Sequence, residues 1–292
     1  MKKSPTLGRL LLLAATLIWG SSFLVTKNTL DSISTPVLLS IRFSGAGLLL
    51  AVIFRKRLKR ISRATLLHGM VVGVVLTASY LAQTYGLERT TAGKNAFLVA
   101  VYTLLVPFVN WLLFRRRPAA RNWGAALLCL MGIGLVSLDG DLTIDTGEWL
   151  SLLSGLFYAF QVTLLSRWGE EDDMLAATVV QFLTVAVILL VYTLLTEPIP
   201  WRVPADCLPA LIYLSLLCTA AALLLQNLGQ SMTPASQSAI LLSLESVFGF
   251  LIATLVGGEA LTLRLGLGFL LIFLAVLVSE GGLRIPFLRR KE

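Results

Sequence analysis

Long apolar stretches separated by short polar ones run along the whole chain. They predict helices at about 7–27, 36–54, 64–87, 91–114, 120–138, 148–167, 174–195, 207–228, 235–256 and 261–280. Each is of the length that crosses the roughly 30 Å hydrocarbon core of a bilayer. Strands of a membrane barrel would alternate apolar and polar residues, whereas residues 10–18 and 183–195 are almost continuously apolar. The pattern predicts an all-α membrane protein with ten transmembrane helices.

The composition agrees with this prediction and narrows the chemistry. Of the 292 residues, 57% are hydrophobic and 14% are charged, whereas a soluble domain is about 25% charged. The predicted loops are too short to hold a soluble catalytic domain. One histidine and the scattered Cys129, Cys207 and Cys218 form neither a disulfide framework nor a metal-ligand pattern. We therefore expect no cofactor, no metal and no enzymatic activity.

The basic residues predict an orientation in the membrane. Of the 24 Lys and Arg residues, eighteen fall on one side of the predicted spans, five fall on the other, and Arg42 lies within a span. Cytoplasmic loops carry an excess of Lys and Arg, so both termini are predicted to be cytoplasmic. The acidic run 170–173 lies on the same side, but acidic residues count little in this rule. Loop placement accounts for the net charge of +8 without a nucleic-acid partner.

The two halves of the chain share a weak repeat. Residues 81–96 align with residues 224–239 at an offset of 143 with six identical pairs, and at an offset of 139 residues 19–22 align with 158–161 and residues 42–43 with 181–182. This predicts two repeats of five helices, residues 1–140 and 141–292. Because five is odd, the second repeat enters the membrane from the opposite side. Inverted repeats are typical of secondary transporters that bind substrate near the midplane and work by alternating access.

Four segments, in their order along the chain, carry a family resemblance. They are Trp19-Gly20-Ser21-Ser22-Phe23 with Lys27, Arg42-Phe43, the junction 86–96, and Leu244-Glu245 to Gly258-Glu259. Together they resemble the EamA family of the drug/metabolite transporter superfamily. Two features depart from the family pattern: Ser246 stands where Pro is common, and residues 115–117 are a run of Arg.

The resemblance implies a ten-helix carrier of the bacterial inner membrane. Spans one to four and six to nine would line a central cavity, and spans five and ten would lie at the periphery. Members of the family are often exporters of amino acids or related metabolites. The expected partners are accordingly a small-molecule substrate and membrane lipid; proton coupling, and the choice between a monomer and a homodimer, stay open.

Two charged side chains fall inside the predicted spans, where a charge costs roughly 2.5–3.5 kcal/mol on insertion scales. Glu245 lies close to the midplane and suits either proton coupling or binding of a substrate amine; a structural, hydrogen-bonded role is equally open. Arg42 could anchor a substrate carboxylate or pair with Glu245. Its position nearer the end of span two favours a guanidinium that reaches the interface or makes a helix-packing contact.

Polar and aromatic side chains also recur at helical spacing on several spans. The candidates that share faces in this way are Trp19, Ser22 and Thr26; Thr77, Tyr80 and Thr84; Asn95 and Tyr102; Ser154, Tyr158 and Gln161; and Ser238 on the face of Glu245. Polar groups are costly against lipid, so these faces should point into the bundle. There they either contact substrate or join helices by hydrogen bonds, and the second role is the more common.

From this set we select Trp19, Ser22, Tyr80, Asn95, Tyr102, Tyr158, Gln161 and Ser238, together with Glu245 and Arg42, as candidate substrate-binding or coupling residues. The aromatic side chains of Trp19, Tyr80 and Tyr102 would suit a flat or amphipathic ligand if they face one cavity.

Three alternatives to a metabolite carrier require different sequence features. Gly93-Lys94-Asn95 resembles the end of a phosphate loop, but that motif needs Gly at position 88, which is Glu, and Ser or Thr at position 95, so a nucleotide-driven pump is not predicted. A membrane-embedded enzyme should have a second carboxylate near the depth of Glu245, which the pattern does not provide. A structural or accessory membrane subunit, or a multidrug and amine exporter of the same superfamily, remains the alternative.

Overall fold

The computed structural model describes residues 5–115, 117–137, 144–168, 173–232 and 235–279, and its regular elements in these ranges are all helices. They are α1 (Pro5–Leu30), α2 (Thr35–Ile53), α3 (Arg55–Leu58), α4 (Arg63–Arg89), α5 (Ala92–Ala100), α6 (Tyr102–Phe114), α7 (Ala120–Ser137), α8 (Thr146–Trp168), α9 (Met174–Thr196), η1 (Ala205–Cys207), α10 (Leu208–Ile212), the π-helix η2 (Tyr213–Ala221), α11 (Ala222–Met232), α12 (Ala235–Leu255) and α13 (Leu263–Ser279). A helix or a series of helices lies at each predicted span.

Most of these helices have the length and composition of membrane spans. Seven of the described helical segments are long and apolar enough to cross a bilayer, and three shorter apolar helices cover 120–136, 241–255 and 263–279. Apolar side chains also face outward: Leu112, Leu195 and Leu255 are 71%, 81% and 79% exposed. Lipid, and not water, is the solvent that such a surface requires. The predicted all-helical membrane fold is confirmed.

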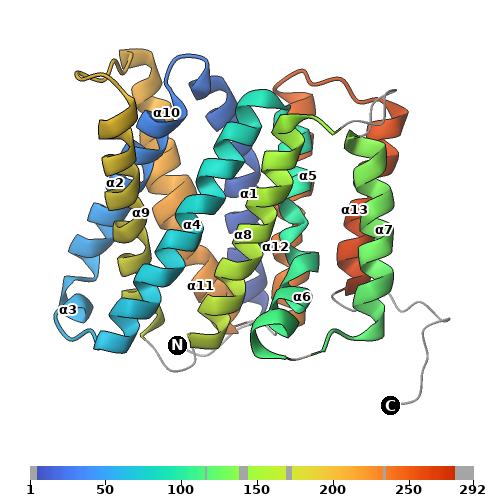
Figure 1. Ribbon diagram of the computed structural model, residues 1–292, viewed down its shortest axis with the longest axis horizontal. Coiled ribbons are helices and arrows are strands. Elements are labelled where there is room, and N and C mark those ends of the chain that lie inside the picture. Colours follow the sequence, from blue (N-terminus) through green and yellow to red (C-terminus); the bar gives the residue numbers. More distant parts are fainter. Residues whose placement is uncertain (1–4, 116, 138–143, 169–172, 233–234, 280–292) are drawn as a thin grey trace.

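The helices stand side by side across the long axis of the molecule, as Figure 1 shows. At one edge α7 packs against α13, and at the other edge α2 packs against α9. Between these pairs, α1 packs along α11 and α12, while α8 packs along α4, α5 and α6. Spans five and ten, which are α7 and α13, therefore lie at the periphery, as the resemblance implies.

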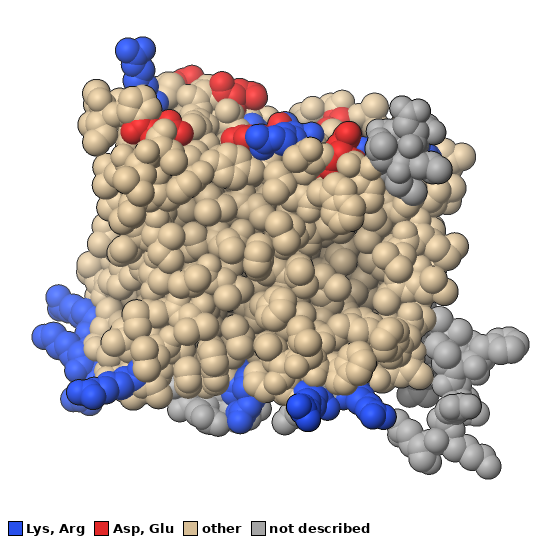
Figure 2. Space-filling view, in the orientation of Figure 1, with Lys and Arg blue, Asp and Glu red and all other residues tan. Residues whose placement is uncertain are grey.

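Charged side chains divide between the two ends of the bundle (Figure 2). Lys and Arg side chains gather at one end of the bundle on the face shown, and we call it the basic end. Helix α1 begins there, and α2 and α3 terminate there. Asp and Glu side chains gather at the opposite end with a few basic ones. An uncharged belt separates the two ends on this face, as expected for the part of the surface that lipid covers.

Side chains next to the helices cap several of their ends. Ser62, Thr91 and Asp173 each accept hydrogen bonds from backbone amides in the first turn of α4, α5 and α9, which satisfies amides that the helix itself cannot. Asp173 also pairs with Arg57 at 2.8 Å. Partial burial raises the pKa of Asp173, but the Arg57 and backbone hydrogen bonds outweigh it and hold the pKa below its ordinary value. The rest of the acidic run, residues 170–172, lies outside the described residues.

Other helix ends are capped by residues far away in the sequence. Lys27 Nζ donates to three carbonyl oxygens at the end of α4, at 2.7–3.1 Å, where the helix dipole favours a positive charge. Glu259 accepts the amide N–H groups of Ala92 and Gly93 at the start of α5. In a phosphate loop the Gly93 amide would bind a nucleotide phosphate; here a carboxylate of the chain takes that place.

One ion pair joins α5 to α8 at the same end of the bundle. Lys94 Nζ lies 2.6 Å from an oxygen of Glu148, whose side chain is only 1% exposed. Glu148 belongs to the first turn of α8, where a negative charge is favourable. The lysine of the phosphate-loop-like segment, Lys94, therefore makes a structural ion pair.

Two spans depart from the continuous helices that the sequence predicts. Span four divides into α5 and α6 at Val101, next to which the Thr103 hydroxyl donates to the carbonyl of Ala100, a local bond that competes with the helical ladder. Span eight widens into the π-helix η2, in which Thr219 Oγ1 donates to the carbonyl of Leu214. Such π-segments often occur at functional sites.

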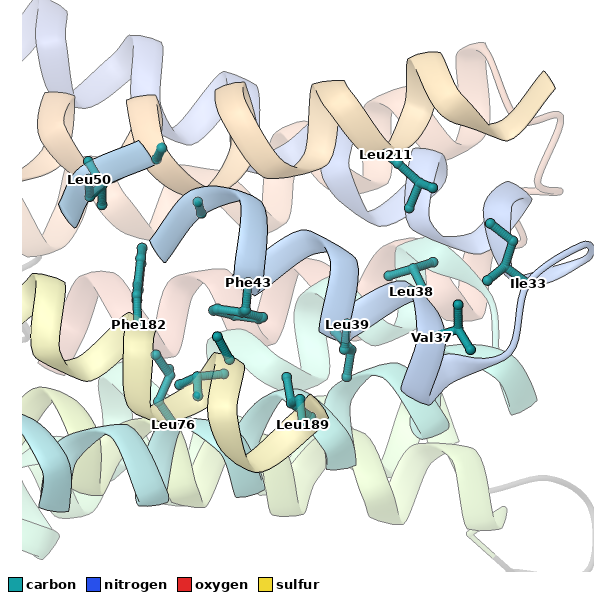
Figure 3. Packing of buried hydrophobic residues seen from close by; sticks show 14 of the residues in the cluster. Ile33, Val37, Leu38, Leu39, Phe43, Leu50, Leu76, Phe182, Leu189 and Leu211 are labelled. Atoms are coloured by element: carbon teal, nitrogen blue, oxygen red, sulfur yellow. The ribbon is translucent and has the colours of Figure 1, made fainter. Parts of the chain in front are cut away.

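A hydrophobic core fixes α2 against α9 and α4 (Figure 3). The rings of Phe43 and Phe182 meet edge to face with centroids 5.6 Å apart. Leu39, Leu76 and Leu189 fill the space beside them. Because interiors of this kind are close-packed, this core fixes the position of Arg42, which directly precedes Phe43 in α2.

Helices α1 and α12 approach each other at Gly20. A Cβ atom at this position would lie 2.6 Å from Cβ of Phe248 and 2.8 Å from the backbone nitrogen of Gly249. Neither neighbour is the flexible end of a side chain, so the two backbones would have to separate. A glycine at this crossing therefore permits the contact between the two helices.

We predict that Gly20→Ala destabilises the protein by about 1–3 kcal/mol, the usual range for overpacking. The control is Gly266→Ala in α13, where the nearest atom would lie 3.5 Å from the new Cβ. Thermal unfolding in detergent should show a lower melting temperature for the first variant and little change for the second. Equal melting temperatures for both variants would contradict the close approach.

Candidate functional site

A cavity of about 560 Å³, its mouth included, lies among α1, α2, α4, α5, α6, α8 and α12, and we call it the central cavity. Its lining consists of Trp19, Ser22, Phe23, Thr26, Arg42, Tyr80, Gln83, Thr84, Leu87, Val99, Tyr102, Tyr158 and Glu245. Thr26 and Leu87 belong to the last two turns of α1 and α4. The cavity therefore extends from the middle of the bundle toward the end opposite the basic end.

Arg42 is held in this cavity by its surroundings. Its side chain is 4% exposed, and Nε donates to Thr219 Oγ1 of η2 at 2.8 Å. The guanidinium carbon lies 5.2 Å from the centroid of the Tyr80 ring, within the range of a cation–π contact. The sequence favours a guanidinium at the interface or a helix-packing contact; Arg42 is buried away from the interface and makes a contact with a neighbouring helix.

The two terminal amino groups of Arg42 have no hydrogen-bond partner among the described residues, since the only bond of the side chain runs from Nε to Thr219. A guanidinium offers five N–H donors. The remaining donors are therefore available to an acceptor in the cavity.

Glu245 enters the same cavity from α12. Its carboxylate makes no hydrogen bond and no ion pair within 4.0 Å in the part of the chain that the structure describes. Arg42, the opposite charge in the cavity, is accordingly beyond ion-pair distance. The suggestion that Arg42 and Glu245 pair directly is therefore not met, and each side chain faces the cavity without an ion-pair partner.

Aromatic rings form much of the remaining wall. Trp19, Tyr80 and Tyr102 all line the central cavity, as the aromatic-trio hypothesis requires. Tyr158 meets Tyr102 edge to face with centroids 4.7 Å apart, and the indole N–H of Trp19 donates to the carbonyl of Cys218 at 2.7 Å. Flat apolar surfaces therefore border the guanidinium and the carboxyl group.

Other sequence candidates lie elsewhere. Ser22 lines the central cavity, but its hydroxyl donates to the carbonyl of Trp19. Asn95 is fully buried outside it, and its amide donates to Ser151 Oγ at 2.7 Å and to the carbonyl of Gln83, so it joins α5 to α8 and α4. The side chain of Ser238 lies outside the described residues. Gln161 lines a different cavity.

That second cavity, of about 320 Å³, borders the central cavity. Its lining consists of Trp19, Leu76, Tyr80, Tyr158, Gln161, Gln181, Phe182, Cys218, Thr219 and Leu223. Trp19, Tyr80 and Tyr158 belong to both linings. The two cavities together draw on spans one to four and six to nine, the set that the resemblance implies.

Sequence reasoning left out two residues that the geometry brings forward. Thr219 holds Arg42, and Gln181 is a buried amide in the second cavity. A signal existed for Gln181, because the repeat alignment pairs it with Arg42. No comparable signal existed for Thr219, because its contact depends on the widened turn of η2. Within the described ranges, no group of three or more His, Cys, Asp or Glu residues could hold a metal ion.

Comparisons with known proteins concern the family and the fold. The model of the EamA-like transporter family matches residues 6–138 and again residues 145–280. An uncharacterized transporter of Archaeoglobus fulgidus is 29% identical over 262 residues, which cover 90% of this chain and 82% of that protein. Uncharacterized transporter YwfM of Bacillus subtilis is 26% identical over 282 residues, 94% of each chain. A solved crystal structure with 16% identity shares the fold with a TM-score of 0.68, over 94% of this chain and 97% of that one.

The geometry predicts that Asn95 serves stability. We expect Asn95→Ala and Ser151→Ala each to lower the melting temperature in detergent, because hydrogen bonds between membrane helices contribute about 0.6 kcal/mol and up to about 2 kcal/mol. The double variant should lose less than the sum of the single losses, since the two side chains form one bond. Fully additive losses would contradict a shared hydrogen bond.

Proposed function

Because the chain belongs to the EamA-like transporter family, we propose that this membrane transporter carries small zwitterionic metabolites of the amino-acid type by alternating access. The observation that carries the proposal is that a guanidinium and a carboxyl group, those of Arg42 and Glu245, face the central cavity without an ion-pair partner. Each charge inside a membrane is costly unless something compensates it. A ligand with a carboxylate and an ammonium group compensates both at once.

The geometry supports one assignment of the ligand's groups. The free N–H donors of Arg42 bind the substrate carboxylate, for which a guanidinium provides two parallel hydrogen bonds. Glu245 accepts the substrate ammonium. The rings of Trp19, Tyr80 and Tyr102 then contact the remaining, less polar part of the substrate.

Glu245 also offers a way to couple transport to protons. A single carboxylate can neutralise its charge with a substrate ammonium or with a proton, but not with both. After the substrate leaves on the outer side, Glu245 binds a proton there. The protonated carrier then returns to the inward-facing state, so that the entry of a proton drives the export of a substrate molecule. Export as the direction rests on the resemblance to the family, whose members are often exporters.

Helix packing supports the two-repeat part of the proposal. The sequence alignment pairs α1 with α8, α2 with α9, α4 with η2 and α11, α5 and α6 with α12, and α7 with α13. The contact of α1 with α12 has its counterpart in the contact of α8 with α5 and α6, and the contact of α1 with α11 has its counterpart in that of α8 with α4. The α2–α9 and α7–α13 contacts each join two counterparts, as a two-fold axis requires.

A multidrug or amine exporter is the second candidate, because Glu245 and the aromatic wall would also bind an amine without a carboxylate. Arg42 distinguishes the two. In an amine exporter an unpaired guanidinium would repel the substrate, whereas in an amino-acid carrier it is required. A purely structural subunit is disfavoured, because it gains nothing from a guanidinium and a carboxyl group left without partners in a cavity.

The main test uses purified protein in liposomes. For carriage of L-leucine, L-threonine and L-phenylalanine we predict that Glu245→Gln and Arg42→Gln each raise KM at least tenfold, because a hydrogen bond to a charged group contributes about 1.5–3 kcal/mol. Glu245→Gln should also abolish stimulation by a proton gradient. Phenethylamine lacks a carboxylate. If the protein is an amine exporter, Glu245→Gln should raise the KM for phenethylamine and Arg42→Gln should lower it.

The matched control is Glu197→Gln, which removes a carboxylate at the end of α9, outside both cavities. It should transport as the unaltered protein does. Failure of all three amino acids to cross faster than in empty liposomes, with and without a proton gradient, would overturn the proposed function.

The charge division supports an orientation with the basic end in the cytoplasm and the central cavity toward the outside. In a chain without its native cysteines, we predict that Ser32→Cys reacts with a membrane-impermeant maleimide in intact cells. Lys59→Cys, at the basic end and also exposed, should react only after the cells are permeabilised. The reverse labelling pattern would invert the orientation.

A further inference from the structure

The second cavity contains two glutamine side chains that are buried without partners. Gln161 is 6% exposed and Gln181 is 3% exposed. Gln161 Oε1 is fully buried with no hydrogen bond, and neither carboxamide has a hydrogen bond within the described part of the chain. Leaving such groups unsatisfied in a native protein is costly and needs an explanation.

The position of this cavity relates it to the central one. Trp19, Tyr80 and Tyr158 line both cavities. Gln161, which lines only the second cavity, lies about one helical turn beyond Tyr158 along α8, in the direction of the basic end. The second cavity therefore adjoins the central cavity and lies closer to the basic end.

The repeat alignment relates the linings residue by residue. At the offset of 139, Ser22 pairs with Gln161 and Arg42 pairs with Gln181. The first member of each pair lines the central cavity and the second member lines the second cavity. Trp19 pairs with Tyr158, and both line both cavities. The second cavity is thus the counterpart of the central cavity, with a carboxamide at the position of the guanidinium.

We propose that the second cavity is a second binding station for the substrate, reached from the basic end, in which Gln161 and Gln181 hydrogen-bond the substrate carboxylate. The proposal rests on the proposed function, because it concerns the same zwitterionic substrate. Each carboxamide NH2 group can donate to the carboxylate, and each carboxamide oxygen can accept from the ammonium. Binding of the substrate satisfies the two amides that the protein leaves without partners.

The exchange of Arg for Gln between the stations has a kinetic consequence. Hydrogen bonds from a guanidinium to a carboxylate are charge-assisted on both sides and bidentate, and are stronger than those from a neutral amide. The second station therefore binds the substrate more weakly than the central one. The KM for transport that starts at the basic end is higher than the KM for transport that starts at the opposite end.

The test measures uptake of radiolabelled L-leucine, L-threonine and L-phenylalanine in right-side-out and inside-out membrane vesicles, which present opposite ends of the protein. Gln161→Ala and Gln181→Ala should each raise the KM from the basic end roughly tenfold and leave the KM from the opposite end within about twofold. Gln181→Arg should lower the KM from the basic end. A variant with equal changes from both ends, or with none, overturns the second station.

The control is Asn122→Ala in α7, which also removes a buried amide, but one that is bonded to Ser279 at 2.9 Å in the peripheral helix pair. It should leave both KM values unchanged, and melting temperatures of all variants establish that they fold. Failure of the unaltered protein to transport any of the three amino acids would overturn the proposed function itself. If the unaltered protein transports the amino acids but Gln161→Ala and Gln181→Ala change the KM equally from both ends, or not at all, the second station alone is overturned.

A second measurement does not depend on transport. In a chain without its native cysteines, Gln181→Cys should react with a small methanethiosulfonate reagent applied from the basic end, and L-leucine, L-threonine or L-phenylalanine should slow that reaction. Absence of the reaction from the basic end overturns the second station, because the cavity would then not be reached from that end.

Discussion

A polar group inside a bilayer has to find its partner within the protein, because hydrocarbon provides neither donors nor acceptors. Many polar side chains of this protein meet that constraint through bonds between helices, as in Ser40–Thr193, Ser79–Ser154, Asn95–Ser151 and Asn122–Ser279. Among the groups without a partner are the terminal groups of Arg42, Glu245, Gln161 and Gln181, and all four line a cavity, whereas Asn95 Oδ1 and Thr254 Oγ1 lack a partner but line neither cavity. The same constraint that builds the bundle thus supports the proposal that a ligand supplies the missing partner where such groups gather around a cavity.

Two close helix contacts bring these groups together. Gly20 lets α1 meet α12 at the backbone, so that Trp19 comes beside the part of α12 that carries Glu245. Gly155 plays the same part in the other half: a Cβ there would lie 2.9 Å from the carbonyl of Val99, and Tyr158, one turn further along α8, meets the aromatic ring of Tyr102. The cavities therefore lie between helix pairs whose spacing glycine permits, and their aromatic linings follow from that spacing.

The sequence predicted the number and position of the spans because membrane thickness and hydrophobicity alone determine them. It also offered Trp19, Tyr80 and Tyr102 as inward-facing residues, since polar faces have to turn away from lipid, but that all three line one cavity is known only from the structure. It could not separate Asn95 from Gln161. Both are amides on an inward face, and the carboxamide oxygen of each lacks a partner. Only the packed structure places two acceptors, Ser151 Oγ and the Gln83 carbonyl, beside the NH2 group of Asn95, whereas the NH2 group of Gln161 has no acceptor among the described residues.

Arg42 and the distant helix caps exceed what a linear pattern can reveal. Thr219 accepts a hydrogen bond from the buried guanidinium, and Thr219 lies in the widened turn of η2. No residue of span eight predicts that widened turn. Likewise the capping of α5 by Glu259 joins residues 166 and 167 positions apart. Such contacts depend on which helices become neighbours, whereas hydrophobic periodicity reports only which face of each helix is buried.

In the proposed mechanism, the part that has to change is the wall formed by Trp19, Tyr80 and Tyr158, the three rings that line both cavities. These rings are held by the Trp19 hydrogen bond to the Cys218 carbonyl, by the edge-to-face contacts of Tyr158 with Tyr102 and of Tyr80 with Phe43, and by the cation–π contact of Tyr80 with Arg42. A neutral hydrogen bond and an aromatic pair each contribute about 0.5–1.5 kcal/mol, and a cation–π contact contributes about 0.5–2 kcal/mol. The loss of one or two of these contacts therefore lies within the few kcal/mol that separate the states of a two-state protein. The backbone contact at Gly20 offers no comparable small step, so the exchange between cavities concerns side chains of the wall before it concerns the helices that carry them.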